Sequence, residues 1–322
     1  MVNSLHSHPE QWKDFFKKVI FRPAEYLMHF GVSNEKLIDY FRYEVNRLMD
    51  VGASIVTIED EKAKYGFALF RKSDFDSKIL NKKVGKVDQI AITSETQLEH
   101  IRQLILSLLE EFKSADLDYV TCRISAANID VIHELEKNGF VIVDQYLVLL
   151  NDMHSHIEGN SFQIPIRIAK DEDIESLQKH IAPTFRYSRF FRDTIISEEA
   201  AVEMHEEWIK NSVLKKVADC VFVADIEDTA AGFVSVEVDR DIEEHLGIKM
   251  GHIPLIGTNP LYRGRKIGQS LTQYVLDHWF KKEDVRYVRI ETQLINIPAT
   301  RTYEHMGFRL VDAAITLRWK KD

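Results

Sequence analysis

"NIPATRTYEHMGF", residues 296–308, has a counterpart at residues 128–140, "NIDVIHELEKNGF". Both segments begin with asparagine and end with Gly-Phe, and a shift of 168 positions (296 − 128) relates them without gaps. The same shift relates residues on either side, namely Tyr119 to Tyr287, Val120 to Val288 and Asp144 to Asp312. A register shared over this length predicts an internal duplication of one fold.

The two halves also share an order of strand-like and helix-like segments. In the first half these segments are 33–50, 53–60, 65–71, 86–92, 98–112, 118–124, 128–139 and 140–150. In the second half they are 164–169, 171–181, 197–213, 220–226, 232–239, 252–258, 286–294, 297–307 and 308–319. The alternation predicts an α/β protein with two domains, each a mixed sheet flanked by helices. We expect domains at 1–150, including a helical N-terminal extension, and at 163–322, with the polar stretch 151–162 as the linker.

The long helix expected in the first half has a recognisable start. Ser94 and Gln97 have the spacing of a capping box just before Leu98, the first of a set of apolar residues at helical spacing. We therefore predict that Ser94 and Gln97 cap this helix.

The composition of the 322 residues is that of a globular protein, with 45% hydrophobic and 29% charged residues. The formal net charge is −9, so we expect no nucleic-acid partner, and a bound anion would need a local positive patch. Cys122 and Cys220 have neither a C-x-x-C nor a metal-ligand spacing, which favours a reduced, cytoplasmic protein without structural zinc. No stretch is typical of a membrane span or a signal peptide, so we expect no membrane association.

Residues 259–271, "NPLYRGRKIGQSL", lie between a strand-like run and a helix-like run. Six consecutive positions contain two glycines and three cations: Arg263, Gly264, Arg265, Lys266 and Gly268. The first four N–H groups of a helix have no internal partner, and with the helix dipole they favour a phosphate. The cations make a diphosphate the expected occupant, and an ordinary basic turn is the alternative. The patterns of a P-loop and of a Rossmann site are both absent.

The first half lacks these chemical features. At 93–100 its sequence, "TSETQLEH", contains no glycine, lysine or arginine, and Leu135 stands where the second half has Tyr303. We interpret the first copy as a retained scaffold without the chemistry.

The loop and the segment 296–308 together resemble the coenzyme A site of the GNAT superfamily of N-acetyltransferases. The family's loop pattern, Gln/Arg-x-x-Gly-x-Gly/Ala, is matched at Arg263 and Gly268, with Lys266 where glycine is usual. Its next segment, Asn-x-x-Ala-x-x-x-Tyr-x-x-x-Gly-Phe, is matched throughout, at Asn296, Ala299, Tyr303, Gly307 and Phe308. The resemblance covers residues 163–322 and, in the first half, residues 128–140. It implies two tandem GNAT-like domains, each a mixed, mostly antiparallel sheet flanked by helices, with the N-terminal copy degenerate.

The resemblance implies a cofactor role for several residues. The pyrophosphate of acyl-CoA would be held by the loop Arg263, Gly264, Arg265, Lys266, Ile267 and Gly268. In this family the preceding strand is splayed from its neighbour, so the pantetheine arm and acyl carbonyl would pair with Ile256, Gly257 and Thr258. Asn296 would orient the cofactor. The co-substrate would be acetyl-CoA or a short hydroxyacyl-CoA, and no metal is implied.

The family's reaction is the attack of a neutral amine on the thioester. The departing thiolate needs a proton, and Tyr303 occupies the position of the family's general acid. The amine's proton needs an acceptor, for which His252 is the first candidate and Glu291 the second. Glu237 and Asp239 are weaker candidates, and a chain of water molecules is a further alternative. The sequence does not select among them.

Residues 184–193, "TFRYSRFFRD", interleave aromatic and cationic side chains. Such a segment can stack on a nucleotide base and bind phosphates, or it can form an amphipathic surface with cation–π contacts. Together with other segments of the second half it is similar to the dTDP-amino-sugar N-acyltransferases, including the dTDP-fucosamine acetyltransferases of surface-polysaccharide (lipopolysaccharide O-antigen) biosynthesis. This implies a dTDP-linked amino-dideoxyhexose as substrate, contacted by Tyr187, Ser188, Arg189 and Phe190.

Three functions are consistent with the sequence. The first is N-acylation of a nucleotide-linked amino sugar. The second is acetylation of another small amine or a protein N-terminus, which would need an acidic groove and is disfavoured by the arginines of 184–193. The third is a non-catalytic acyl-CoA sensor, which the presence of Tyr303 disfavours. The degenerate copy would shape the sugar pocket or supply a homodimer surface, and the sequence leaves both open.

Overall fold

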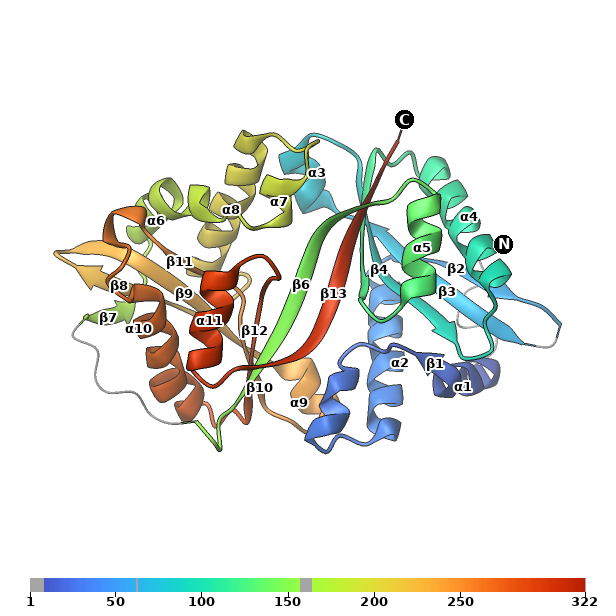
Figure 1. The fold of residues 1–322 in the computed structure, drawn as a ribbon, viewed down its shortest axis with the longest axis horizontal. Helices are drawn as coiled ribbons and strands as arrows, with labels where there is room; N and C mark the ends of the chain where they lie inside the picture. Colours follow the sequence, from blue (N-terminus) through green and yellow to red (C-terminus); the bar gives the residue numbers. More distant parts are fainter. Residues whose placement is uncertain (1–8, 62, 157–163, 322) are drawn as a thin grey trace. The chain divides into compact units, whose positions relative to one another are not determined.

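The computed structural model describes residues 9–61, 63–156 and 164–321 of the chain, shown in Figure 1. The chain forms two compact units. The first unit is Met1–Gln145 with Ala313–Asp322, and the second unit is Tyr146–Asp312. None of the helices in these described ranges is both long and apolar enough to cross a membrane.

The first unit is built on a mixed sheet with the strand order β2-β3-β4-β5-β13. β4 and β5 are parallel, and the other neighbours along this path are antiparallel. A two-residue strand, β1 (Val19–Ile20), pairs with β4. The other strands are β2 (Ser54–Glu59), β3 (Lys64–Lys72), β4 (Val84–Thr93), β5 (Tyr119–Ser125) and β13 (Arg309–Lys320). The helices are α1 (Pro9–Lys18), α2 (Asn34–Asp50), α3 (Asp74–Leu80), α4 (Leu98–Ser114) and α5 (Ile129–Lys137).

Hydrophobic cores lie on both faces of this sheet, because side chains alternate along each strand. On β3, Ala68 and Phe70 belong to the core that includes α4 and α5, whereas Phe67 and Leu69 belong to the core that includes α1 and α2. The apolar residues spaced along α4, such as Phe112, are buried as their helical periodicity predicts.

The second unit has the strand order β6-β12-β10-β9-β8-β7, and β11 pairs with β9. Only β10 and β12 are parallel among these pairs. The strands are β6 (Val141–Asp152), β7 (Ile166–Ile168), β8 (Cys220–Ile226), β9 (Thr229–Asp239), β10 (Met250–Ile253), β11 (Ile256–Thr258) and β12 (Tyr287–Gln293). The helices are α6 (Asp173–Ile181), α7 (Arg189–Arg192), α8 (Glu198–Val213), α9 (Arg240–Leu246), α10 (Ile267–Tyr274) and α11 (Ile297–His305). A π-helical segment, Val275–Phe280, continues α10.

The last strand of each chain half pairs within the unit formed mainly by the other half. β6 follows α5 of the first half, but its residues Tyr146–Asp152 pair with β12. β13 follows α11 of the second half, but its residues Ala314–Lys320 pair with β5. The compact units therefore divide at 145/146 and 312/313, whereas the domains expected from local patterns were 1–150 and 163–322.

The predicted α/β class is confirmed, because the strands within each unit pair in a mixed, mostly antiparallel arrangement flanked by helices. The predicted capping box is wrong in one member. Gln97, not Ser94, is the N-cap of α4, and its capping-box partner is His100. The reason is that the hydroxyls of Thr93 and Thr96 hydrogen-bond to each other and fold the preceding loop. Residues 157–162 of the expected linker lie outside the described residues.

Replacing Trp319 tests the exchange of the last strand. Trp319 lies on β13, is 9% exposed, and its ring lies 5.5 Å from that of Phe112 on α4. Trp319→Ala should lower the free energy of unfolding by roughly 3–5 kcal/mol and speed hydrogen exchange in α4 and β3 of the first unit.

The control is Leu310→Ala on the same strand, because Leu310 is 57% exposed and its loss should change stability by less than about 0.5 kcal/mol. If Trp319→Ala instead sped hydrogen exchange in β9 and β10 of the second unit and left hydrogen exchange in α4 unchanged, the placement of β13 in the first unit would be contradicted.

Candidate active site

The cationic loop of the second unit carries charges without ion-pair partners. Arg263, Arg265 and Lys266 are exposed, and none of them contacts a carboxylate within the described ranges. Gly264 and Lys266 have φ angles of 80° and 59°, in the left-handed region, and Lys266 is the N-cap of α10. The left-handed backbone brings the chain sharply into the helix, so the three cations gather at the N-terminus of α10.

The backbone of the same loop has unused donors. From Gly264 to Gln269, no N–H group donates to a backbone carbonyl of the described chain; the first such bond is from Ser270 N–H to Lys266 O, at 2.9 Å. Orphan N–H groups at a helix N-terminus bind anions well. The loop therefore has both the donors and the charge that a diphosphate requires.

The strand that leads into this loop is separated from its parallel neighbour. β10 pairs with β12 up to Ile253 and Ile290, where Pro254 interrupts the ladder because proline has no N–H. Beyond it, β11 pairs with β9 alone among the described strands. The splay that the family resemblance implied is thus present in the structure.

The pairing register shows which backbone groups face the gap. Ser235 N–H donates to Leu255 O at 2.9 Å, and Asn259 N–H donates to Ala231 O at 3.0 Å. Hydrogen-bonded pairs alternate in an antiparallel ladder, so the N–H and C=O groups of Ile256 and Thr258 point away from β9. They form an open edge to which an amide-containing ligand could add.

Two glycines allow this edge to be packed from both sides. A Cβ on Gly232 would lie 2.6 Å from Cγ2 of Ile267, so this glycine lets α10 approach β9. A Cβ on Gly257 would lie 2.4 Å from Cγ2 of Ile181. The absence of a side chain at 257 is therefore explained by the contact with α6.

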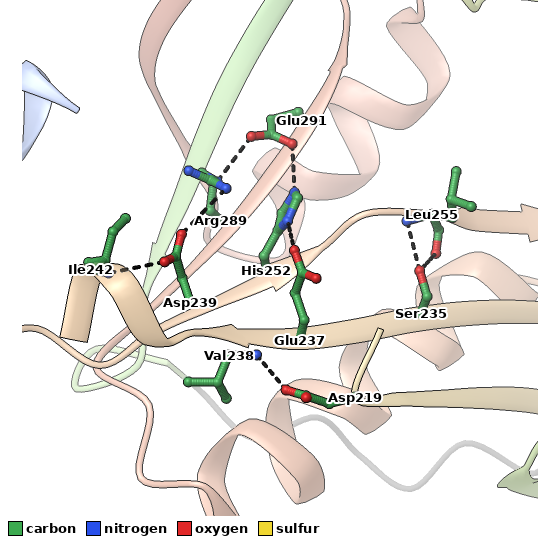
Figure 2. A network of polar contacts seen from close by, with 10 residues as sticks. All are labelled: Asp219, Ser235, Glu237, Val238, Asp239, Ile242, His252, Leu255, Arg289 and Glu291. Carbon is green, nitrogen blue, oxygen red and sulfur yellow. Dashed lines mark hydrogen bonds and ion pairs between the residues drawn. The ribbon is translucent and has the colours of Figure 1, made fainter. Parts of the chain in front are cut away.

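His252, the first candidate for the proton acceptor, contacts two of the other candidates, Glu291 and Glu237, as Figure 2 shows. His252 Nδ1 lies 2.7 Å from Glu237 Oε1, and His252 Nε2 lies 2.6 Å from Glu291 Oε2. The side chain of Glu237 is 36% exposed, whereas those of His252 and Glu291 are 12% and 16% exposed. Glu237 is therefore the end of the network that solvent or a substrate can reach.

Arg289 and Tyr146 complete this network. The ion pair between Arg289 Nε and Glu291 Oε1 measures 3.0 Å, and a longer one of 3.9 Å joins Arg289 to Asp239. Tyr146 hydrogen-bonds to Glu291. The sequence analysis did not single out either residue. Arg289 could have been found as a cation two positions before Glu291 on a buried strand, but Tyr146 reaches the site through the strand exchange, which leaves no local signal.

The two carboxylates hold His252 in its charged form. Burial alone would lower the pKa of His252, but Glu291 and Glu237 outweigh burial and raise it above 6.5. Burial likewise opposes the charge on Glu291, but His252 and Arg289 lower the pKa of that carboxyl well below its usual range. In the charged form that the raised pKa favours, the imidazolium donates its two N–H groups to the two carboxylates.

The network faces the same side of the sheet as the segment 184–193. Side chains alternate along β9, so Glu237 shares a face with Phe233, which packs in the core formed with α6 and α8. His252 is paired with Glu237 and so shares that face. Phe185, from the aromatic segment, lies 6.5 Å from Phe233, ring centroid to ring centroid. An acceptor that reaches Glu237 would therefore approach on the face that carries this segment.

The aromatic side chains of the segment mostly point into a cluster around His205. Phe185 stacks on His205 at 4.8 Å, and Phe190 packs edge-on to Trp208 at 5.4 Å. Burial lowers the pKa of His205 to about 4, so this ring is neutral. Phe190 is 1% exposed, which makes it part of the core and not of a surface that a substrate could contact in this conformation.

The polar residues of the segment are placed differently. Tyr187 is 39% exposed, and Ser188 precedes α7 with a buried hydroxyl that has no partner in the described structure. The guanidinium of Arg189 lies 3.9 Å from the ring centroid of Phe190. Arg186 forms an ion pair with Glu198 at 2.6 Å, while Arg192 is exposed and has no carboxylate partner among the residues described.

Tyr303 and Asn296 both belong to α11. Tyr303 is buried with its ring 5.9 Å from that of Phe308, and burial raises the pKa of its hydroxyl well above 10. This phenol is protonated at neutral pH, the state a proton donor needs. Asn296 caps the helix, accepting from Ala299 N–H at 3.4 Å and donating to Thr292 Oγ1 at 3.1 Å. No group of histidine, cysteine or acidic side chains in the described ranges could hold a metal ion.

Comparisons with known proteins agree with this geometry. Residues 175–308 match the model of the acetyltransferase (GNAT) family. The spore coat polysaccharide biosynthesis protein SpsD of Bacillus subtilis (strain 168) is 26% identical over 243 residues, which cover 76% of this chain and 80% of SpsD.

Two solved structures have a similar fold. A GCN5-related N-acetyltransferase from Sphaerobacter thermophilus has a TM-score of 0.59 at 15% identity, covering 86% of this chain and 85% of that one. A tandem GNAT protein from the clavulanic acid biosynthesis pathway has a TM-score of 0.56 at 13% identity, covering 96% of this chain and 94% of that one. At these identities the likeness concerns the fold, and the second match extends over both units.

Replacing His252 should cost stability in a pH-dependent way. Because the folded-state pKa of His252 is raised, its contribution is fully present below the unfolded value of about 6.5 and is lost as pH rises through the folded value. The difference in unfolding free energy between wild type and His252→Asn, measured by urea unfolding from pH 5.5 to 9, should shrink as pH rises.

The control is His305→Asn, which removes an exposed histidine from the end of α11. Its difference from wild type should stay within about 0.5 kcal/mol across the range. A His252→Asn difference that is constant or grows with pH would show that the imidazolium is not what the two carboxylates stabilise.

Proposed function

Since residues 175–308 form a GNAT acetyltransferase domain, we propose that the protein is an N-acyltransferase that moves the acyl group of acyl-CoA to the amine of a nucleotide-linked amino-dideoxy sugar. The observation that carries the proposal is the open edge of β11 leading into a loop with three unpaired cations and a row of orphan N–H groups. This combination fits a ligand with an amide-bearing arm and a diphosphate.

The residues that would hold acyl-CoA are those of the edge and the loop. The edge groups of Ile256 and Thr258 would pair with the amides of the pantetheine arm, as an added strand pairs with a sheet edge. The N–H groups from Gly264 to Gln269 would bind the pyrophosphate, with Arg263, Arg265 and Lys266 supplying charge-assisted contacts. Acyl-CoA supplies the activated acyl group, acetyl or a short hydroxyacyl.

In the reaction the amine nitrogen forms a bond to the acyl carbon while the carbon–sulfur bond breaks. The proton on the nitrogen passes to His252, and the thiolate sulfur receives a proton or a hydrogen bond from Tyr303. Because the pKa of Tyr303 lies above the value of about 8.5 typical of a thiol, full proton transfer is uphill, so hydrogen bonding to the developing thiolate is the main contribution.

His252 must lose its own proton before it can accept another. The raised pKa favours its charged form, and Glu237 is the exposed carboxylate through which a proton can reach solvent or a bound amine can be positioned. The rate of acyl transfer at low acceptor concentration should therefore rise with pH. The midpoint of that rise should lie above 6.5, the unperturbed pKa of histidine. His252→Asn should remove that rise.

The nucleotide-sugar acceptor is supported by two observations. The relative SpsD is described as a spore coat polysaccharide biosynthesis protein, and polysaccharides are built from activated sugars. Tyr187 and Arg192 are exposed residues of the segment 184–193, and they offer a ring and a cation to a nucleotide diphosphate.

A thiol-release assay tests the function. Acetyl-CoA and 3-hydroxybutyryl-CoA would be crossed with dTDP-3-amino and dTDP-4-amino dideoxyhexoses. One pair should turn over, and Tyr303→Phe should lower its kcat by roughly 100-fold or more. Tyr274→Phe, a tyrosine on α10 that packs against Phe222, is the matched control and should stay near wild type. Release of thiol with none of these sugars, while CoA still binds, would refute the sugar acceptor.

The cofactor loop is tested by binding. Arg263→Ala/Lys266→Ala should weaken CoA binding, measured by calorimetry, by on the order of 100-fold, since a charge-assisted contact contributes about 1.5–3 kcal/mol and exposed ones lie at or below the lower end. The remaining affinity should depend less steeply on salt. Lys282→Ala removes an exposed lysine elsewhere on the unit and should leave affinity unchanged. Equal affinities for the double variant and wild type would exclude this loop as the phosphate site.

A further inference from the structure

The strand edge that is open in the second unit is filled in the first. Resting on the proposed function of the second unit, we propose that β1 occupies, in the first unit, the position that the pantetheine arm of acyl-CoA takes in the second. One chain then binds one acyl-CoA, in the second unit.

The first unit has the same separation of strands. β4 is parallel to β5 only from Val84 to Val87, and β4 then continues to Thr93 without β5. Its other edge stays paired with β3 as far as Ile92. The end of β4 therefore presents one free edge, on the side of β5, as β11 does on the side of β12.

β1 lies on that free edge. Val19 pairs with Thr93 and Ile20 pairs with Ile92, in antiparallel orientation. Since one edge of β4 at Ile92 is taken by β3, β1 must occupy the other. A further bond, from Ser94 N–H to Lys18 O at 3.2 Å, continues the pairing toward the loop.

The segment that carries β1 is built into the core of the first unit. Trp12, Phe15 and Phe16 of α1 pack with Phe41 and Phe67, and Val19 is 3% exposed. Displacing β1 would expose this apolar surface, so a ligand would have to compete with several kcal/mol of burial at about 25 cal/mol per Å². The pairing of β1 with the edge of β4 is therefore a stable part of the fold of the first unit.

The loop after β4 has also lost its capacity for phosphate. Thr96 N–H donates to Thr93 O at 3.1 Å, and Gln97 N–H donates to His100 Nδ1 at 3.3 Å. In the loop of the second unit, the N–H groups of Gly264 and Arg265 donate to no backbone carbonyl of the described residues. Gln97 and His100 form a reciprocal capping box on α4. The carboxylate of Glu95 stands in this loop, paired with Lys18 at 2.9 Å. Satisfied donors and an acidic side chain disfavour a diphosphate.

The same segment thus explains why the first copy can keep its fold without its cofactor. A strand edge without a partner exposes backbone donors and acceptors and invites pairing with other chains. β1 supplies those hydrogen bonds permanently, whereas in the second unit they are left for the ligand. The N-terminal extension acts as an internal substitute for the cofactor arm.

Calorimetric titration of the full chain with acetyl-CoA tests the proposal. We expect a stoichiometry of one, and we expect Arg263→Ala/Lys266→Ala to weaken that single binding event on the order of 100-fold without revealing a second component. The matched variant on the equivalent helix of the first unit, Arg102→Ala/Lys113→Ala, removes two exposed cations from α4 and should leave both affinity and stoichiometry unchanged. A stoichiometry of two, or residual binding that Arg102→Ala/Lys113→Ala weakens, would overturn the proposal.

Hydrogen exchange gives a readout that does not need CoA binding. The amides of Ile92 and Ser94 should exchange slowly in the free protein and show no change on adding acetyl-CoA, whereas the amides of Ile256 and Thr258 should exchange rapidly and become protected. If wild type does not bind acetyl-CoA at all, the proposed function fails, but slow exchange at Ile92 and Ser94 would still support the filled edge. Rapid hydrogen exchange at these two amides in the free protein would overturn the proposal that β1 fills the edge.

Discussion

Unpaired backbone hydrogen-bonding groups are the constraint on which the structure of both units depends. In each copy one strand parts from its parallel neighbour, and the polar edge so created must be satisfied by another chain segment, by water or by a ligand. The first unit uses β1 for this purpose. The second leaves the groups of Ile256 and Thr258 open and continues directly into a loop with free N–H groups and unpaired cations. The same fold thus yields a closed scaffold and a candidate binding site.

Charge in the second unit is arranged in two separate places. The cations of the loop are exposed and unpaired, which suits an anion that arrives from solvent. The network of Glu237, His252, Glu291 and Arg289 is largely buried and paired, which fixes the protonation state of the histidine. Only Glu237 is substantially exposed. The exposed charges of the loop and the largely buried charges of the network are therefore two distinct features of the second unit.

Local sequence predicted the elements, the duplication and the loop, because apolar periodicity and glycine placement are local properties. It identified Glu237, His252 and Glu291 only as separate candidates, since their contact depends on the register of three strands. The capping box at Ser94 was wrong because α4 begins at Leu98, so Gln97 is the N-cap and His100 its capping-box partner. The strand exchange and β1 were not predicted, because pairing partners far apart in the chain leave no local pattern and a two-residue strand is too short to show one.

The most direct test of the central claim is a crystal structure of the full chain grown with acetyl-CoA. The account predicts one CoA per chain, with its pantetheine arm against the edge of Ile256 and Thr258 and its pyrophosphate at the N–H groups from Gly264 to Gln269. β1 should remain on β4. A CoA molecule bound against β4 in place of β1, or a second unit whose β11 edge stays open while CoA binds elsewhere, would contradict it.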